Sequence, residues 1–247
     1  AWGLENTADG VRSFSLAVVE ALAGAAAILK PQVALYERFG SKGFAALEDT
    51  LSAAKAAGLL TLADAKRGDI GSTMAAYATA WLDDASPLAS DAVTLSPYLG
   101  YESLRPALDL AAATGRGVFV LGLTSNPEGP SVQHVGGGNS VAKTIIDQVT
   151  AENSSAEDLG HVGLVVGATI GDAPAKLGID LAASKAPLLT PGLGAQGATA
   201  ADIAKSFASS YGQVLGTSSR DILKAGPDKT ALRDKALRVR DELLAAS

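Results

Sequence analysis

The stretch TLADAKRGDIGSTMAAYA, residues 61–78, joins an apolar run to the start of a helical segment and places four charged side chains between them. These are Asp64, Lys66, Arg67 and Asp69. Alternation along a strand places Asp64 and Lys66 on the same face. Burying an unpaired charge beside a core element is costly, so the charges are either solvated in a surface loop or held together by the fold for a purpose.

The same alternation of a short apolar run and a longer helical segment repeats along the chain. Apolar runs that predict strands lie at 24–30, 59–66, 91–97, 117–124, 161–169, 186–192 and 212–217. Segments that predict helices lie at 6–22, 41–58, 72–84, 101–115, 139–153 and 228–246. Nearly continuous apolar strands that alternate with helices are typical of parallel strands buried on both faces. This pattern predicts either a (β/α)8 barrel or an open doubly wound sheet.

We expect the barrel, an α/β fold of the (β/α)8 TIM type, with its first strand missing from this chain. The chain opens with the helical segment 6–22, and no predicted strand precedes it. A barrel whose first strand was lost or not recorded has this order, and a seven-stranded open sheet is the alternative. No linker or change in composition divides the sequence, so we expect one domain over residues 1–247.

Composition excludes several classes of function. The net charge of −6 disfavours general binding of nucleic acid, although a local anion site remains compatible with it. The chain has no Cys, which excludes disulfides and thiolate metal sites, and His134 and His161 have no partners at the spacing of metal ligands. No apolar stretch approaches the roughly 20 residues of a membrane span. We therefore expect no metal, no nucleic-acid partner, no membrane partner and a cytoplasmic location.

The charged stretch lies at the carboxyl end of its predicted strand, where barrels of this type carry their active sites. Lys30 ends the preceding predicted strand in the same position, so its ammonium group can reach Asp64. Two lysines interleaved with two carboxylates form a charge-balanced array, which can survive burial where a lone charge cannot. A solvated loop between strand and helix is the alternative interpretation.

A second group of residues predicts a phosphate site. The glycine-rich turn PGLGAQG, residues 191–197, precedes a helix beginning near Ala198, and the last predicted strand ends in GTSSRDI, residues 216–222. Loops after the last two strands form the usual phosphate site of such barrels, with backbone N–H groups facing the anion. The glycines alone are equally typical of a plain tight turn, but Gln196 and Arg220 favour the phosphate site.

Taken together, these motifs resemble orotidine 5′-phosphate decarboxylases of the longer bacterial subfamily. The stretch DAKRGDIGST, residues 64–73, looks like the signature of that family. The resemblance continues in order through LKPQ (29–32), SPYLG (96–100), TSNPEG (124–129), VVGAT (165–169), PGLGAQG (191–197) and SRDILKAGPD (219–228). It implies a cofactor-free decarboxylation of orotidine 5′-phosphate (OMP) to UMP, the last step of pyrimidine synthesis.

The resemblance also implies roles for the charged residues. A Lys–Asp–Lys–Asp array surrounds C6 of the substrate, and Lys30, Asp64 and Lys66 belong to one subunit, with Lys66 as the proton donor to C6. Asp69 and Thr73 are implied to reach into the site of the neighbouring subunit in a homodimer and to meet the ribose there.

The remaining substrate contacts are implied in the same way. Ser125 matches the serine that hydrogen-bonds the pyrimidine, with Pro127 beside it, and Gln196 and Arg220 match the phosphate-binding residues. The main departure from the family is at the N-terminal end. In the family the first strand carries an aspartate, in a Gly-Ile-Asp-Pro type motif, that holds the ribose. This sequence has no counterpart of that motif. The glycine run at 136–138 indicates either a lid segment or an ordinary surface loop.

Two other functions stay open at this point. Metal-dependent sugar-phosphate decarboxylases or aldolases on the same scaffold share an Asp-x-Lys-x-x-Asp pattern, although Lys30 and the continuation RGDIGST favour the nucleotide enzyme. A barrel that has kept its anion site and lost its chemistry is the non-catalytic alternative.

Overall fold

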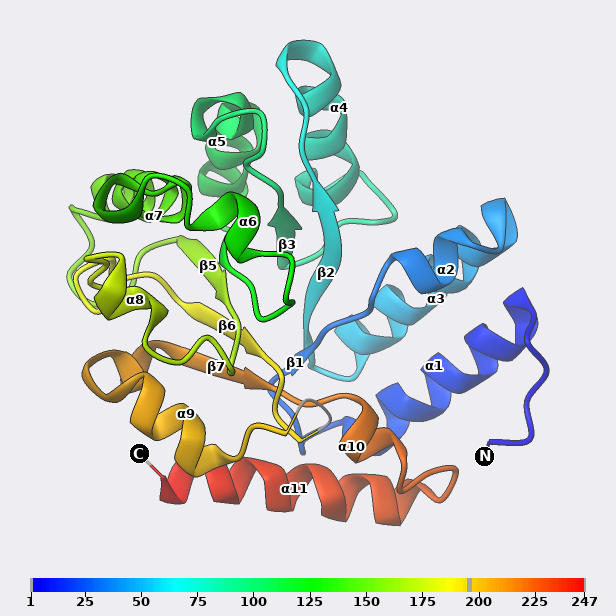
Figure 1. Ribbon diagram of the computed structural model, residues 1–247. Helices are drawn as coiled ribbons and strands as arrows, with labels where there is room; N and C mark the ends of the chain where they lie inside the picture. Colours follow the sequence, from blue (N-terminus) through cyan, green and yellow to red (C-terminus); the bar gives the residue numbers. More distant parts are fainter. Residues whose placement is uncertain (1, 195–196, 247) are drawn as a thin grey trace.

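The computed structural model describes residues 2–194 and 197–246 and shows one curled parallel sheet with helices around it (Figure 1). Each strand pairs in parallel with the next in the order β1 to β7. The strands are β1 (Ile28–Leu29), β2 (Leu60–Arg67), β3 (Ala92–Leu95), β4 (Gly117–Leu123), β5 (Val162–Val166), β6 (Leu188–Pro191) and β7 (Val214–Thr217). A doubly wound sheet reverses its strand order at a switch point, whereas a barrel keeps sequential order. The prediction of a barrel seen with seven strands is therefore confirmed.

The helices lie outside the curl of the sheet (Figure 1). The longer ones are α1 (Ala8–Leu22), α3 (Gly40–Ala56), α4 (Gly71–Leu82), α5 (Arg105–Thr114), α7 (Val141–Glu152) and α11 (Lys229–Ala245). Shorter turns are α2 (Ala34–Glu37), η1 (Tyr101–Leu104), α6 (Pro130–Gln133), η2 (Gly137–Asn139), α8 (Ala173–Lys176), α9 (Ala200–Ser206), η3 (Ala208–Gln213) and α10 (Arg220–Leu223). The first and last long helices, α1 and α11, pack side by side.

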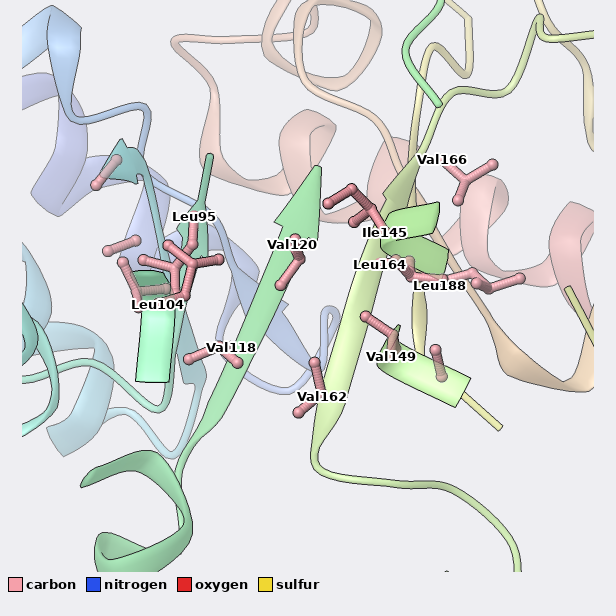
Figure 2. Close-up of a cluster of buried hydrophobic side chains, with 14 of the residues drawn as sticks. Leu95, Leu104, Val118, Val120, Ile145, Val149, Val162, Leu164, Val166 and Leu188 are labelled. Atoms are coloured by element: carbon pink, nitrogen blue, oxygen red, sulfur yellow. The ribbon is translucent and has the colours of Figure 1, made fainter. Parts of the chain in front are cut away.

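The main core lies between the outer face of the sheet and the helices (Figure 2). Along β4 and β5 every second residue points into it, and the helices contribute side chains such as Leu104, Ile145 and Val149. The strand residues shown there are Leu95, Val118, Val120, Val162, Leu164, Val166 and Leu188. This period of two sends the intervening residues to the opposite face of the sheet.

A smaller apolar cluster fills the concave inner face of the sheet. Its buried members are Leu62, Ala92, Phe119, Val165 and Leu189, one from each of the strands β2 to β6. A side chain two residues further along the same strand lies on the same face, one step closer to the carboxyl end. This places Asp64 beyond Leu62 and therefore on the inner face of the sheet.

The predicted helices and strands agree with the structure within a few residues, except at the first strand. β1 is only two residues long because Pro31, which has no N–H group to donate, follows Lys30. Pairing with β2 resumes at an isolated bridge between Gln32 and Asp64. Within the described part of the chain, no helix is long and apolar enough to cross a membrane.

Candidate active site

A cleft of about 400 Å³ opens at the carboxyl ends of the strands. Leu121, Val165 and Leu189 line it from the inner face of the sheet, so the apolar inner cluster continues into the cleft. The other residues around it are Lys30, Gln32, Asp64, Lys66, Thr124, Ser125, Asn126, Pro191, Gly192, Leu193, Thr217, Ser219 and Arg220. The cleft thus has a charged end near β1 and β2 and a glycine-containing end near β6 and β7.

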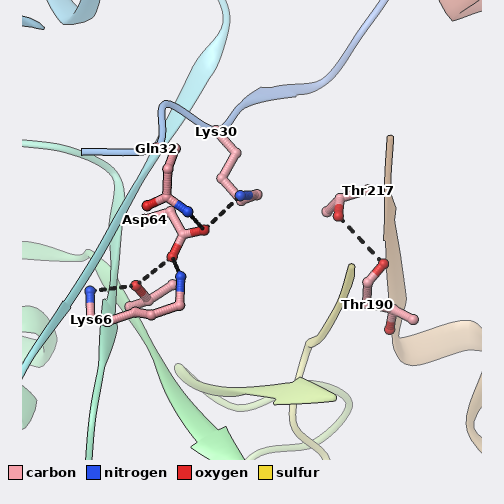
Figure 3. A network of polar contacts seen from close by, with 7 residues as sticks. Lys30, Gln32, Asp64, Lys66, Thr190 and Thr217 are labelled. Atoms are coloured by element: carbon pink, nitrogen blue, oxygen red, sulfur yellow. Dashed lines mark hydrogen bonds and ion pairs between the residues drawn. The ribbon is translucent and has the colours of Figure 1, made fainter. Parts of the chain in front are cut away.

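Asp64 is the centre of the charged end (Figure 3). Lys30 Nζ donates to its Oδ2 at 2.7 Å, and Gln32 Nε2 donates to the same oxygen at 3.1 Å. Lys66 Nζ donates to the other oxygen, Oδ1, which also accepts the hydroxyl of Thr94 at 3.0 Å. Asp64 is only 7% exposed. The alternative of a solvated loop is therefore wrong for this carboxylate, which is buried and paired on both oxygens.

The electrostatics of Asp64 follow from these contacts. Burial alone raises the pKa of its carboxyl group, but the charges of Lys30 and Lys66 and the hydrogen bonds that they donate outweigh burial. The pKa of Asp64 is consequently lowered from its ordinary value. Near neutral pH the site therefore holds an ionised carboxylate between two lysine side chains.

The loop after β2 does not bring every predicted residue to this cleft. Asp69 is partly buried, and its Oδ1 accepts the backbone N–H of Ile70 at 2.8 Å. Thr73 is exposed in the first turn of α4. Neither residue is among the described residues that line the cleft. The structure thus joins Lys30, Asp64 and Lys66 and leaves Asp69 and Thr73 out of the cleft of their own chain.

The loop between β4 and α6 supplies another wall of the cleft. Ser125 lines the cleft, whereas Pro127 is exposed and is not among its described lining residues. Gly167, just after β5, makes room for the serine, because a Cβ atom there would lie 2.8 Å from Ser125 Cβ. A close approach of this kind requires glycine. The glycine run at 136–138 belongs partly to the short turn η2.

The predicted phosphate end lies across the cleft from Asp64. Pro191, Gly192 and Leu193 follow β6, and Ser219 and Arg220 follow β7. The ends of these strands are joined by the hydroxyl of Thr217, which donates to Thr190 O at 3.4 Å (Figure 3). Arg220 lines the cleft from the start of α10 and is exposed. Gln196, the other predicted phosphate ligand, lies outside the described residues.

Two residues of the site were missed by sequence reasoning. Gln32 donates to Asp64, and Thr94 donates to Asp64 while accepting the backbone N–H of Lys66 at 2.9 Å. Gln32 stands in the quoted segment LKPQ, two residues after Lys30, so its spacing on the strand was a usable signal. Thr94 had a weaker signal, as a polar residue at the inward-facing position of an otherwise apolar strand.

A larger hollow of about 830 Å³ lies beside α8 and α9 and contains none of the predicted site residues. Its acidic side chains already have local partners. Asp172 pairs with Lys176, Asp180 accepts the N–H of Ala183, and Asp202 caps α9. We therefore place the site at the smaller cleft, where polar groups from several strands converge. In the described residues no group of three or more His, Asp or Glu side chains is arranged to hold a metal ion.

Comparisons with known proteins show which family this sequence matches. Residues 12–234 match the sequence profile of the orotidine 5′-phosphate decarboxylase / HUMPS family. The orotidine 5′-phosphate decarboxylase of Salinispora arenicola is 55% identical over 99% of this chain and 87% of its own length, and that of Streptomyces coelicolor is 54% identical over the same shares.

Solved structures show the same similarity. A crystal structure of a Streptomyces avermitilis protein assigned as an orotidine 5′-phosphate decarboxylase has a TM-score of 0.94 and 53% identity, over 99% of this chain and 85% of that chain. The OMP decarboxylase of Leishmania donovani has a TM-score of 0.77 and 30% identity, over 96% of this chain and 90% of that chain. This chain, with its paired Lys30–Asp64–Lys66 cleft, belongs to the orotidine 5′-phosphate decarboxylase family.

Proposed function

We propose that Lys66 protonates C6 when this carboxy-lyase converts OMP to UMP, and that Asp64 and Lys30 hold its ammonium group in place. The proposal rests on one observation above all, the buried carboxylate of Asp64 shared between the two lysines. The side chain of Lys66 is 44% exposed, compared with 17% for Lys30. Lys66 is thus the lysine with more of its side chain open to an incoming ligand.

The chemistry requires such a cation. Loss of CO2 from C6 leaves an electron pair in an sp2 orbital that the ring π system cannot delocalise. A preorganised positive charge beside C6 stabilises that pair as it develops, and the same ammonium group then donates a proton to form the C6–H bond. Asp64 holds this ammonium group in position, because its Oδ1 accepts a hydrogen bond from Lys66 Nζ.

The other end of the cleft is suited to the phosphate of the nucleotide. Arg220 offers a guanidinium group, and the turn at Gly192 and Leu193 offers backbone close to it. The expected contribution of Gln196 belongs to this part of the proposal. Ser125, which lines the cleft from the loop after β4, is assigned to the pyrimidine, with Pro127 expected beside it. Binding energy from the phosphate can be used at the reacting carbon if it is realised in the transition state.

A homodimer with shared sites is part of the proposal. Asp69 and Thr73 do not line the cleft of their own chain, and an exposed apolar patch lies next to them. The patch consists of Ile70, Tyr98 and Leu99, each more than half exposed. The two loops that carry it touch, since a Cβ on Gly68 would lie 2.3 Å from Ser96 O. A second copy covering this patch would receive Asp69 and Thr73 near its cleft.

The role of Lys66 is tested by following the ultraviolet absorbance of OMP in the presence of EDTA. Lys66→Ala is expected to reduce kcat on the order of 10³-fold or more, while the affinity for UMP is retained. Lys176→Ala, which removes an exposed lysine that is not among the described lining residues of the cleft, is the control and should behave as wild type. Turnover of Lys66→Ala at a rate near wild type would contradict the proposal. Loss of wild-type activity in EDTA would instead favour the metal-dependent sugar-phosphate alternative.

Shared sites are tested by mixing variants. In a two-fold dimer, subunits of Asp69→Ala and Lys66→Ala that exchange at random should recover roughly a quarter of the wild-type activity, because half of the dimers contain one intact site. Mixing Lys66→Ala with Asp64→Asn is the matched control, since both changes affect the same subunit's side of a site. Equal activity of the two mixtures would contradict the shared site.

We also assign a cytoplasmic location, because a charged nucleotide substrate does not diffuse through a bilayer.

A further inference from the structure

Thr94 is the one fully buried polar side chain on β3. It lies two residues after Ala92, and therefore on the inner face of the sheet above the apolar cluster that Ala92 belongs to. A buried hydroxyl group is costly unless it is hydrogen-bonded. The partners of this hydroxyl are both in the proposed catalytic array.

The direction of the two hydrogen bonds is fixed by chemistry. The backbone N–H of Lys66 can only donate, so Thr94 Oγ1 accepts it, at 2.9 Å. The single hydrogen of the hydroxyl is then available for Asp64 Oδ1, at 3.0 Å, since an ionised carboxylate only accepts. Thr94 thus connects the backbone of Lys66 to the same carboxylate oxygen that accepts the ammonium group of Lys66.

The backbone at Lys66 needs such support. Its φ angle is +48°, a left-handed conformation that is uncommon for residues other than glycine. The pairing of β2 with β3 is irregular between Ala63 and Arg67, so the ladder is interrupted around this residue. The hydroxyl of Thr94 therefore accepts a hydrogen bond from the Lys66 amide where the hydrogen bonds between β2 and β3 are interrupted. Strained conformations of this kind persist when the surrounding structure holds them, and they are common at active sites.

We propose that Thr94 is a positioning residue for the decarboxylation, which orients the Lys66 ammonium group by binding both the Lys66 backbone and Asp64. The inference rests on the proposed role of Lys66. The ring of contacts runs from the Lys66 amide to the Thr94 hydroxyl, to Asp64 Oδ1, and back through Lys66 Nζ. Without the hydroxyl, the Lys66 amide and Asp64 Oδ1 each lose a hydrogen-bond partner. The backbone conformation at Lys66 is then less well fixed, and so is the position of the Lys66 ammonium group.

The test compares Thr94→Val with Thr94→Ser. Valine has nearly the shape of threonine without the hydroxyl, whereas serine keeps the hydroxyl and loses the methyl group. We expect Thr94→Val to lower kcat by roughly 10- to 100-fold, as small misplacements of a reacting group do. The KM for OMP should change by about twofold or less, since the phosphate end is untouched. Thr94→Ser should recover most of kcat, and circular dichroism should show all variants folded.

Three results would overturn the inference. These are a wild-type kcat in Thr94→Val, an equal loss in Thr94→Val and Thr94→Ser, or a loss confined to KM. If Thr94→Val does not fold, Thr94→Ala provides the same comparison with Thr94→Ser.

A double variant separates this inference from the proposed role of Lys66. In the background of Lys66→Ala, the change Thr94→Val should have little further effect on the residual rate, because the two residues act as a unit. A further 10-fold loss in that background would show that Thr94 acts independently of Lys66 and would contradict the inference. Near wild-type turnover of Lys66→Ala alone would instead contradict the proposed function, whatever Thr94→Val does.

Discussion

The two ends of the cleft differ in how they are held. At the charged end, Asp64 is buried, and side chains from β3 and from the segment after β1 converge on it together with Lys66. At the opposite end, Arg220 is exposed at the start of a four-residue helix. The first end is organised before any ligand arrives, as electrostatic stabilisation of a transition state requires. The second leaves Arg220 open to solvent, where we propose that it meets the phosphate of the substrate.

The largest expected effect comes from breaking the organised end. Asp64→Asn keeps the shape of the side chain but removes the charge between Lys30 and Lys66. We expect kcat to fall on the order of 10³-fold, because the cation is no longer held in position. Leaving the half-buried Lys30 without its partner should also cost about 3 kcal/mol of the free energy of unfolding, measured by urea titration. Retention of both rate and stability would mean that the buried pair has no role.

Breaking the exposed end should affect binding more than chemistry. Arg220→Ala removes a cation that lines the cleft, and hydrogen bonds to charged groups contribute about 1.5–3 kcal/mol. KM for OMP should therefore rise by roughly 10- to 100-fold, with a weaker dependence on salt. Arg238→Ala, an exposed arginine of α11, is the matched control. An unchanged KM would remove Arg220 from the phosphate site.

The lowered pKa of Asp64 makes its contribution to the free energy of unfolding depend on pH. Because its pKa is lower in the folded protein than the ordinary value of 3.8, the ionised carboxylate stabilises the fold fully above pH 3.8. That contribution is lost as the pH falls below 3.8 and through the lowered pKa of the folded state. The difference in unfolding free energy between wild type and Asp64→Asn should accordingly be constant from pH 7 to about 5 and shrink below pH 4. A difference that does not change with pH would contradict this.

The sequence could predict the parts of the site that depend on strand order and alternation. The carboxyl ends of parallel strands meet at one edge, so Lys30, Asp64 and Lys66 could be placed together before the structure was known. Thr94 could not be assigned a role, because threonine is an ordinary strand residue and its partners depend on a local irregularity in the pairing of β2 and β3. The positive φ of Lys66 depends on the same irregularity.

Two short helices and the positions of two predicted site residues could not be predicted from the sequence, for simpler reasons. The turns α2 and α10 contain four residues each, too few to show a helical period. Asp69 and Thr73 were predicted for the site but lie away from the cleft of their own chain, and one chain cannot show where a second subunit would receive them. The mixing experiment is what decides their role.

The smallest expected effect comes from Asp84, which, like Asp64, is an aspartate paired with a cationic side chain. It therefore provides a direct comparison between an exposed and a buried carboxylate. Asp84 accepts from Arg116 at 2.6 Å, about as close as Lys30 is to Asp64, but its side chain is 81% exposed. In water the gain from such a pair is offset by solvation and side-chain entropy. Asp84→Asn should change the free energy of unfolding by about 0.5 kcal/mol or less and leave turnover unchanged. A loss equal to that of Asp64→Asn would mean that contact distance, rather than burial among several donors, determines what a carboxylate contributes here.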